Sequence, residues 1–271
     1  MNFTFMGMDI YSLLFVMMVY SFIGWFYEST IYSILEQRRL MNRGYFLGPY
    51  CPIYSVVCMA SLYLLQGVES GIKIVIIGGM TVCVIEYITS YVLEKLFDAR
   101  YWDYSAYPLN INGRISAISG LFFGFAILLL DKIVHPFMMS VVGRMSQQTR
   151  IIVGTSCFAI FLIDFIVTTV SMCNLNKKCK EIYDYLNDYV DNKFEAMTDK
   201  GRFIEENLRF EKKTDIIVKL SGMTSKFKEN ETHFFRAFPS FKSTKYADLI
   251  DKIKMIYKKK KVNEYDKKTE E

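Results

Sequence analysis

The chain has 271 residues, of which 52% are hydrophobic and 16% aromatic, and its formal net charge is +5. Its apolar residues stand in long unbroken runs, which excludes an ordinary water-soluble domain of this size. Residues 1–173 carry ten basic and ten acidic residues, whereas residues 174–271 carry 23 and 18. The composition therefore predicts a transmembrane helical domain over 1–173 and a soluble, basic, helical tail over 174–271, whose end we expect to be disordered.

Five segments are hydrophobic enough to cross a bilayer, which takes about 20 apolar residues in a helix. In chain order we predict spans at 10–35, within 44–68, at 74–93, at 115–130 (extendable to 134) and at 151–173. No Lys or Arg precedes Arg38, so the first segment is expected to be a retained span and not a signal peptide. The predicted fold class is all-α: a polytopic membrane bundle of about five transmembrane helices with a helical cytoplasmic tail.

Basic residues in short loops predict the orientation, because cytoplasmic loops are enriched in Lys and Arg. The first loop, the third loop and the start of the tail hold the following basic residues: Arg38, Arg39, Arg43, Lys95, Arg100, Arg114, Lys177, Lys178 and Lys180. These regions alternate onto one face, so we expect a cell-membrane protein with its N-terminus outside and its tail in the cytoplasm. The fourth loop disagrees, since Lys132, Arg144 and Arg150 would lie outside. Either residues 136–149 form an interfacial helix or the span count is wrong by one.

Three carboxylates fall inside the predicted spans: Glu28, Glu86 and Asp164. Each costs about 2.5–3.5 kcal/mol if it is ionised at mid-membrane, so something must offset that cost. Glu28 and Glu86 lie at matching depth on the cytoplasmic side, and Arg114 enters from there.

This arrangement predicts a polar cavity open to the cytoplasm; the alternative is a buried ion pair that only fixes packing. For Asp164 a site role and an inter-helix hydrogen bond are both open. The candidate cavity residues are Trp25, Glu28, Glu86, Asn112, Arg114 and Asp164.

Two loops on the cytoplasmic face have unusual sequences. The first reads N-R-G-Y-F-L-G-P-Y-C-P-I-Y over 42–54, and its glycines and prolines break helical geometry. The third, over 93–114, is rich in aromatic residues and paired charges. Irregular backbone at membrane depth must be buried in protein or line a water-filled cavity, so we expect both loops to be ordered; re-entrant packing without a ligand is the alternative. The candidate loop residues are Arg43, Gly48, Pro49, Pro52, Arg100, Trp102, Asp103 and Tyr104.

These motifs carry a family resemblance. G-W-x-x-E at 24–28, R-G-x-x-x-G-P-x-x-P-x-Y at 43–54, E-Y at 86–87 and the run from Glu94 to Arg114 resemble the ABC-transporter permease family of the CmpB type, which are bacterial multi-pass membrane proteins. The resemblance covers about residues 10–175. It implies a membrane transport component and carries over no catalytic residue. The chain lacks a G-x-x-x-x-G-K-[S/T] phosphate loop, so a separate nucleotide-binding ATPase would have to supply ATP hydrolysis.

The tail shows apolar spacings of three and four, which predict amphipathic helices over 177–220, broken near Gly201, and over 247–257, before Lys258–Lys261. Nearly balanced charge argues against a nucleic-acid partner. No metal or cofactor site is expected, because the six cysteines show no C-x-x-C spacing and His135 and His233 form no ligand pattern.

The leading hypothesis is a non-enzymatic membrane transport component with a cytoplasm-facing polar site. Its expected partners are the lipid bilayer, a separate ATPase subunit and, as a further option, a second copy of the chain. One alternative is an interaction or regulatory protein whose tail docks a cytosolic partner. Another is an intramembrane enzyme acting on lipid with Glu28 or Glu86 as acid/base, for which the sequence offers no nucleophile or metal set.

Overall fold

The computed structural model describes residues 4–38, 40–198, 222–223, 227–238 and 242–243. The predicted break near Gly201, the helix at 247–257 and the lysine run lie outside these residues. Within them the chain is an all-α bundle with a few two-residue strands. Four helical stretches are long and apolar enough to cross a membrane: Ile10–Leu35, Gly71–Phe97, Ala117–Arg144 and Gln147–Tyr185. The chain is a multi-pass membrane protein.

The first span begins after a small hairpin of β1 (Thr4–Phe5) and β2 (Met8–Asp9). It consists of α1 (Ile10–Phe26), the π-helical segment η1 (Tyr27–Tyr32) and α2 (Ser33–Gln37). Asp9 starts α1 because its side chain accepts hydrogen bonds from the backbone N–H groups of Tyr11 and Ser12. The wider π turn falls where Glu28 enters the bundle.

The second predicted span is only half helical. α3 (Pro52–Leu64) has 13 residues, or about 20 Å, which is too short for a hydrocarbon core of about 30 Å. The non-helical chain before it lies along α1, and the backbone N–H of Cys51 donates to the carbonyl of Ser21 at 2.9 Å. At the other end of α3, Tyr63 stacks on Phe5. The span predicted within 44–68 is therefore an irregular segment followed by a half-helix.

α4 (Gly71–Phe97) and α5 (Ala117–Leu129) pack closely and antiparallel. Glycines allow this approach: a Cβ atom on Gly79 would lie 2.6 Å from the carbonyl oxygen of Gly120. Small residues of this kind let membrane helices approach backbone to backbone. Between the two helices, residues 98–116 contain β3 (Ala99–Arg100), β4 (Asn110–Ile111) and β5 (Ile115–Ser116), and β4 pairs with β5.

α5 continues through the π-helical segment η2 (Leu130–Val134) into α6 (His135–Arg144). Pro136 explains the irregular turn, because proline lacks a backbone N–H and its ring clashes with the preceding turn. α6 continues the fourth apolar helical stretch to Arg144, and α7 begins at Gln147.

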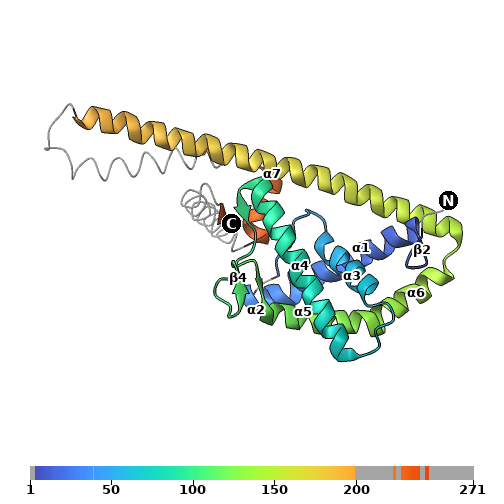
Figure 1. The fold of residues 1–271 in the computed structure, drawn as a ribbon. Helices are drawn as coiled ribbons and strands as arrows, with labels where there is room; N and C mark the ends of the chain where they lie inside the picture. Colours follow the sequence, from blue (N-terminus) through green and yellow to red (C-terminus); the bar gives the residue numbers. More distant parts are fainter. Residues whose placement is uncertain (1–3, 39, 199–221, 224–226, 239–241, 244–271) are drawn as a thin grey trace, which may run out of the picture.

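α7 (Gln147–Thr198) is the longest helix in the described part of the chain and runs past the whole bundle without a break at 173/174, where the composition changes (Figure 1). Farther along, α9 (Glu229–Ala237) packs against α7, and β6 (Lys242–Ser243) pairs with β3. Figure 1 shows α9, in orange-red, beside the end of α4 and below α7.

Two buried clusters result. One lies at the end of α4 and along α7 and includes Phe97, Tyr101, Leu175 and Phe234. The other lies among α1, α3, α4 and the continuous helical stretch of α5, η2 and α6.

Candidate functional site

A cavity of about 280 Å³ lies between α1, α3, α4 and the α5–η2 rod. Its walls are almost entirely aliphatic and aromatic. Glu86 of α4 is the only acidic residue among those that line it. The aromatic residues of the wall are Tyr20, Tyr27, Tyr54, Phe122 and Phe123. Cavities of this kind, apolar with a few placed polar groups, are typical of small-molecule sites.

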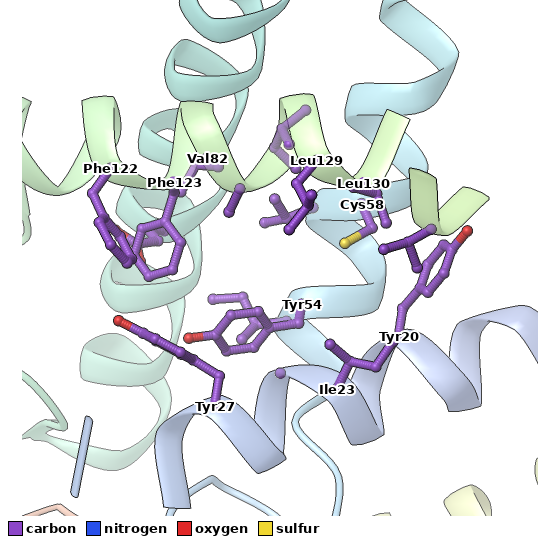
Figure 2. Close-up of a pocket in the computed structure, with 17 residues that line it drawn as sticks. Tyr20, Ile23, Tyr27, Tyr54, Cys58, Val82, Phe122, Phe123, Leu129 and Leu130 are labelled. Atoms are coloured by element: carbon purple, nitrogen blue, oxygen red, sulfur yellow. The ribbon is translucent and has the colours of Figure 1, made fainter. Parts of the chain in front are cut away.

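Figure 2 shows how the rings lie. Tyr54 extends from α3 into the space between α1 and α5, and its hydroxyl points to the same side as that of Tyr27. Phe122 and Phe123 face these two tyrosines from α5, and Tyr20 closes the opposite end. Rings from three helices thus surround one space.

Local sequence explains why this space exists. A Cβ atom on Gly24 would overlap the Tyr54 ring, so only glycine lets Tyr54 lie against α1. Both π-helical segments contribute to the wall, η1 through Tyr27 and η2 through Leu130 and Val134. Single π turns inside α-helices occur frequently at functional sites.

Glu28 and Glu86 flank Tyr54 but have different surroundings. The Tyr54 hydroxyl donates to Glu28 Oε1 at 2.6 Å, and Arg43 Nε lies 3.8 Å from Glu28 Oε2. Glu86 is partly exposed toward the cavity, yet its Oε2 atom is buried and has no hydrogen-bond partner among the described residues. The two carboxylates interact electrostatically. Glu28 is therefore held by protein groups, whereas Glu86 offers a carboxyl group to the cavity.

Arg114, which the sequence places in one polar cavity with Glu28 and Glu86, pairs elsewhere. Its Nη2 atom lies 2.7 Å from Glu94 Oε2, and its Nη1 atom donates to Ser90 at 3.0 Å. Arg100 Nε donates to the same Glu94 oxygen at 2.8 Å. The third loop folds back along α4, so Arg114 meets the last turns of that helix and not Glu28 or Glu86.

Two other cavity candidates also lie elsewhere. Asn112 donates its side-chain amide to the Tyr87 hydroxyl at 3.1 Å, in the network of the third loop. Trp25 donates its indole N–H to Asn42 at 2.5 Å, which ties α1 to the first loop. Neither residue lines the cavity. The single polar pocket expected from the sequence is thus divided into separate groups.

Asp164 is the anchor of the first loop. Its carboxylate accepts hydrogen bonds from the backbone N–H groups of Leu47 and Gly48 and from the hydroxyls of Tyr50 and Thr168, at 2.7–3.2 Å. These four donors offset the cost of its burial. Asp164 therefore forms hydrogen bonds, but with the first loop and its own helix and not with a neighbouring helix as predicted.

The remaining first-loop candidates form contacts within the fold or shape the bend of the loop. Arg43 is buried, with its guanidinium 4.6 Å from the centre of the Tyr32 ring, and its backbone N–H donates to the Ser29 hydroxyl. Pro49 follows Gly48 in the bend, and Pro52 occupies the first turn of α3, where its missing N–H costs nothing.

In the third loop, the Trp102 indole N–H donates to the Arg114 carbonyl at 3.0 Å, and Asp103 accepts from the backbone N–H of Ser105. The backbone N–H of Tyr104 donates to the Gly113 carbonyl. Burial raises the pKa of Tyr104, and the charges of Glu86 and Glu28 raise it further. Tyr104 of the third loop is therefore within electrostatic range of both carboxylates, whereas Arg114 pairs with Glu94.

Sequence reasoning missed α9 as part of the folded protein. Glu231, which is 1% exposed, accepts both hydrogen bonds from Lys178 Nζ of α7, at 2.9 and 2.7 Å. His233 Nε2 donates to the Gly44 carbonyl of the first loop at 3.1 Å. Burial lowers the pKa of His233. The capping pattern of a glutamate in the first turn was an available signal for the helix, but no local pattern indicates where it docks.

The aromatic wall of the cavity was also missed, because bulky apolar residues look alike in any span. The spacing Gly120-x-x-x-Gly124 was an available signal for the α4–α5 contact.

Comparison with known proteins gives one match. Searches of curated proteins and of solved structures found none for this chain. Residues 15–169, more than half of the chain, match the family described as "Putative ABC-transporter type IV", the CmpB-type family that the loop motifs resemble. The match spans the cavity-lining helices, both loops and Asp164. The chain belongs to this ABC-transporter family.

Proposed function

We propose that the chain is the permease subunit of an ABC-type transport system and that the cavity around Glu86 is its substrate site. The observation that carries this proposal is an apolar cavity of about 280 Å³ among the spanning helices, with a carboxylate that no described residue pairs. A buried ionisable group inside a membrane domain is expensive unless it serves a function. A half-helix preceded by irregular backbone is also typical of transporter sites.

We further propose that the N-terminus lies outside and the C-terminus inside. The half-helical second crossing brings the number of crossings to five, which fits the basic first and third loops on one face. Two basic residues that this orientation leaves outside have acidic partners: Arg150 Nη1 lies 2.8 Å from Asp9 Oδ2, and Lys132 Nζ lies 3.0 Å from Asp131 Oδ2. A membrane-impermeant maleimide should label Arg144→Cys from outside; labelling only from inside would overturn this orientation.

The proposed system needs an ATPase on another chain, and this chain has no enzymatic role of its own. The third loop is the proposed docking surface, because it is rigidly tied to α4 and presents exposed apolar residues. Tyr107 and Leu109 are 46% and 77% exposed. A partner that pushes on this loop would act directly on Tyr104 and on the α4–α5 pair that walls the cavity.

Site-specific photocrosslinking tests this partner. Benzoylphenylalanine replaces Tyr107 in the third loop, and the matched control carries it at Glu69, an exposed residue in the turn before α4. After irradiation in native membranes, we expect the Tyr107 variant to crosslink to a protein with a phosphate-loop ATPase domain and the Glu69 variant not to do so. Absence of an ATPase from both sets of crosslinks would remove the support for the permease assignment.

A further inference from the structure

We propose that the cavity binds an organic cation with an apolar body, such as a quaternary ammonium compound, and that Glu86 is its counter-charge. This inference deepens the proposed function, on which it rests, by naming the substrate class of the same cavity. It depends on two independent features of the wall, the unpaired carboxylate and the aromatic rings.

An unpaired carboxyl group favours a cationic occupant. Glu86 Oε2 is buried and has no hydrogen-bond partner among the described residues, while nearby Glu28 is held by Tyr54 and Arg43. A buried charge is strongly disfavoured unless an opposite charge accompanies it. Arg43 already contacts Glu28 and stacks on Tyr32, and Arg114 is paired with Glu94. A cation in the cavity would supply the missing charge.

The rest of the wall selects the kind of cation. Five aromatic rings face the space, and aromatic faces attract alkylated ammonium groups that have little hydration to lose. A metal ion needs several oxygen, nitrogen or sulfur ligands, and no group of three His, Cys, Asp or Glu occurs in the part of the chain described. An anion would be repelled by Glu86. A lipid acyl chain would fit the apolar wall but would leave the carboxylate unpaired.

Binding of phenyltrimethylammonium to the purified full-length chain in lipid nanodiscs tests the proposal. The matched ligand is tert-butylbenzene, which has nearly the same shape and no charge. The affinity of each compound is measured by its competition with radiolabelled phenyltrimethylammonium. We expect the cation to bind at least about tenfold more tightly than tert-butylbenzene, as a charge and its aromatic cage predict. Equal affinities would mean a purely apolar cavity, such as a lipid site, and would overturn the proposal.

Three variants locate the site. Glu86→Gln keeps the side-chain shape, and we expect it to weaken cation binding about tenfold while tert-butylbenzene affinity changes less than about twofold. Glu69→Gln makes the same chemical change at an exposed position and should leave both affinities unchanged. Ala126→Phe places a ring in the cavity and should weaken both ligands. Wild-type cation affinity in Glu86→Gln would overturn the assignment of Glu86.

A measurement on the unmodified chain covers the case in which Glu86→Gln fails to fold. Dicyclohexylcarbodiimide adds to a buried carboxylic acid to give an N-acylurea, which peptide mass analysis locates. We expect phenyltrimethylammonium to protect Glu86 from this reaction and tert-butylbenzene to protect it much less; equal protection contradicts the proposal. Neither assay requires an ATPase, so the two proposals can fail separately. Cation binding without ATPase crosslinks would reject only the permease assignment. ATPase crosslinks without cation binding would reject only this inference.

Discussion

The Oδ2 atom of Asp164 lies 2.7 Å from the backbone nitrogen of Gly48, so a carboxylate on α7 replaces the helical hydrogen bonding that the first loop lacks. On its other side the loop is tied to α1, where the backbone N–H of Cys51 donates to the Ser21 carbonyl. Non-helical backbone at membrane depth is stable only when protein supplies such partners. The irregular segment before α3 is therefore fixed between α1 and α7.

Asp164→Asn tests this role. The amide group of asparagine would face donors that now meet a carboxylate, so at least one backbone N–H would lose its acceptor. We expect a loss of roughly 2–3 kcal/mol in unfolding free energy, measured by denaturant titration in mixed micelles.

Thr168→Val is the matched control, because it removes one of the four donors and leaves the carboxylate with three. It should lower the unfolding free energy by only about 1 kcal/mol. An Asp164→Asn protein as stable as the wild type would show that the carboxylate does not hold the loop.

Glu94 should matter more to the third loop than Arg100 does. Glu94 Oε2 contacts both Arg100 and Arg114, and Arg114 is the more deeply buried of the two arginines. Glu94→Gln leaves two guanidinium groups beside each other without their shared counter-charge. We expect this to lower the unfolding free energy by about 2–3 kcal/mol. Arg100→Gln removes a partner that is 32% exposed and should cost less than about 1 kcal/mol. Limited proteolysis within residues 98–116 reports both effects, and equal sensitivity of the two variants would contradict this ranking.

The sequence predicts the membrane class and the long apolar helices because hydrophobic length is a local property, but within 44–68 it predicts a full span where the structure has the short helix α3. It also places Glu28, Glu86 and Asp164 inside the long apolar helices. What it does not give is which charges meet: Arg114 and Glu28 lie at compatible depth, but the third loop turns back along α4 and brings Arg114 to Glu94.

Long-range docking is the other limit. Nothing local in residues 229–237 indicates that Glu231 meets Lys178 or that His233 meets Gly44. These contacts depend on the path of the chain after α7. The change in composition at 173/174 does not mark a break in the helix, because α7 continues through it.

The docking of α9 should weaken at low pH. Burial lowers the pKa of His233 from its ordinary value of 6.5, and the charge of Arg236 lowers it further, although Asp164 and the hydrogen bonds to Gly44 and Phe46 oppose this. The unfolded state then binds the proton more tightly than the folded state. Stability is therefore complete above pH 6.5 and falls as the pH drops below it, by at most about 1.4 kcal/mol per pH unit.

The measurement compares thermal unfolding of the wild type and His233→Gln between pH 8 and pH 5. Glutamine can still donate to Gly44 but does not titrate in this range. We expect the stability difference between the two proteins to shift in favour of His233→Gln as the pH falls. A difference that is constant across this range would mean that His233 does not control the docking of α9.

Glycine-to-alanine changes should separate the cavity from the rest of the bundle. A Cβ atom on Gly24 overlaps the Tyr54 ring, whereas one on Gly143 in α6 has nothing within 4 Å. Both residues are helical, so alanine brings the same gain in helix propensity at each, up to about 1 kcal/mol. Gly143→Ala should therefore be neutral or slightly stabilising. Gly24→Ala must displace Tyr54 from Glu28, and we expect it to destabilise the protein by roughly 1–3 kcal/mol, as overpacking of a core does.

The displaced ring links this prediction to the cavity. Tyr54 forms part of the wall and donates to Glu28, so its movement would release the Glu28 carboxylate and change the space beside Glu86. Two second changes in the Gly24→Ala background distinguish the causes. If the loss comes only from the broken Tyr54–Glu28 hydrogen bond, neither Tyr54→Phe nor Tyr54→Ala should recover stability. If it comes from overlap with the ring, Tyr54→Ala should recover stability and Tyr54→Phe should not. Recovery with neither, together with an unaltered cavity, would place the function of Gly24 outside this contact.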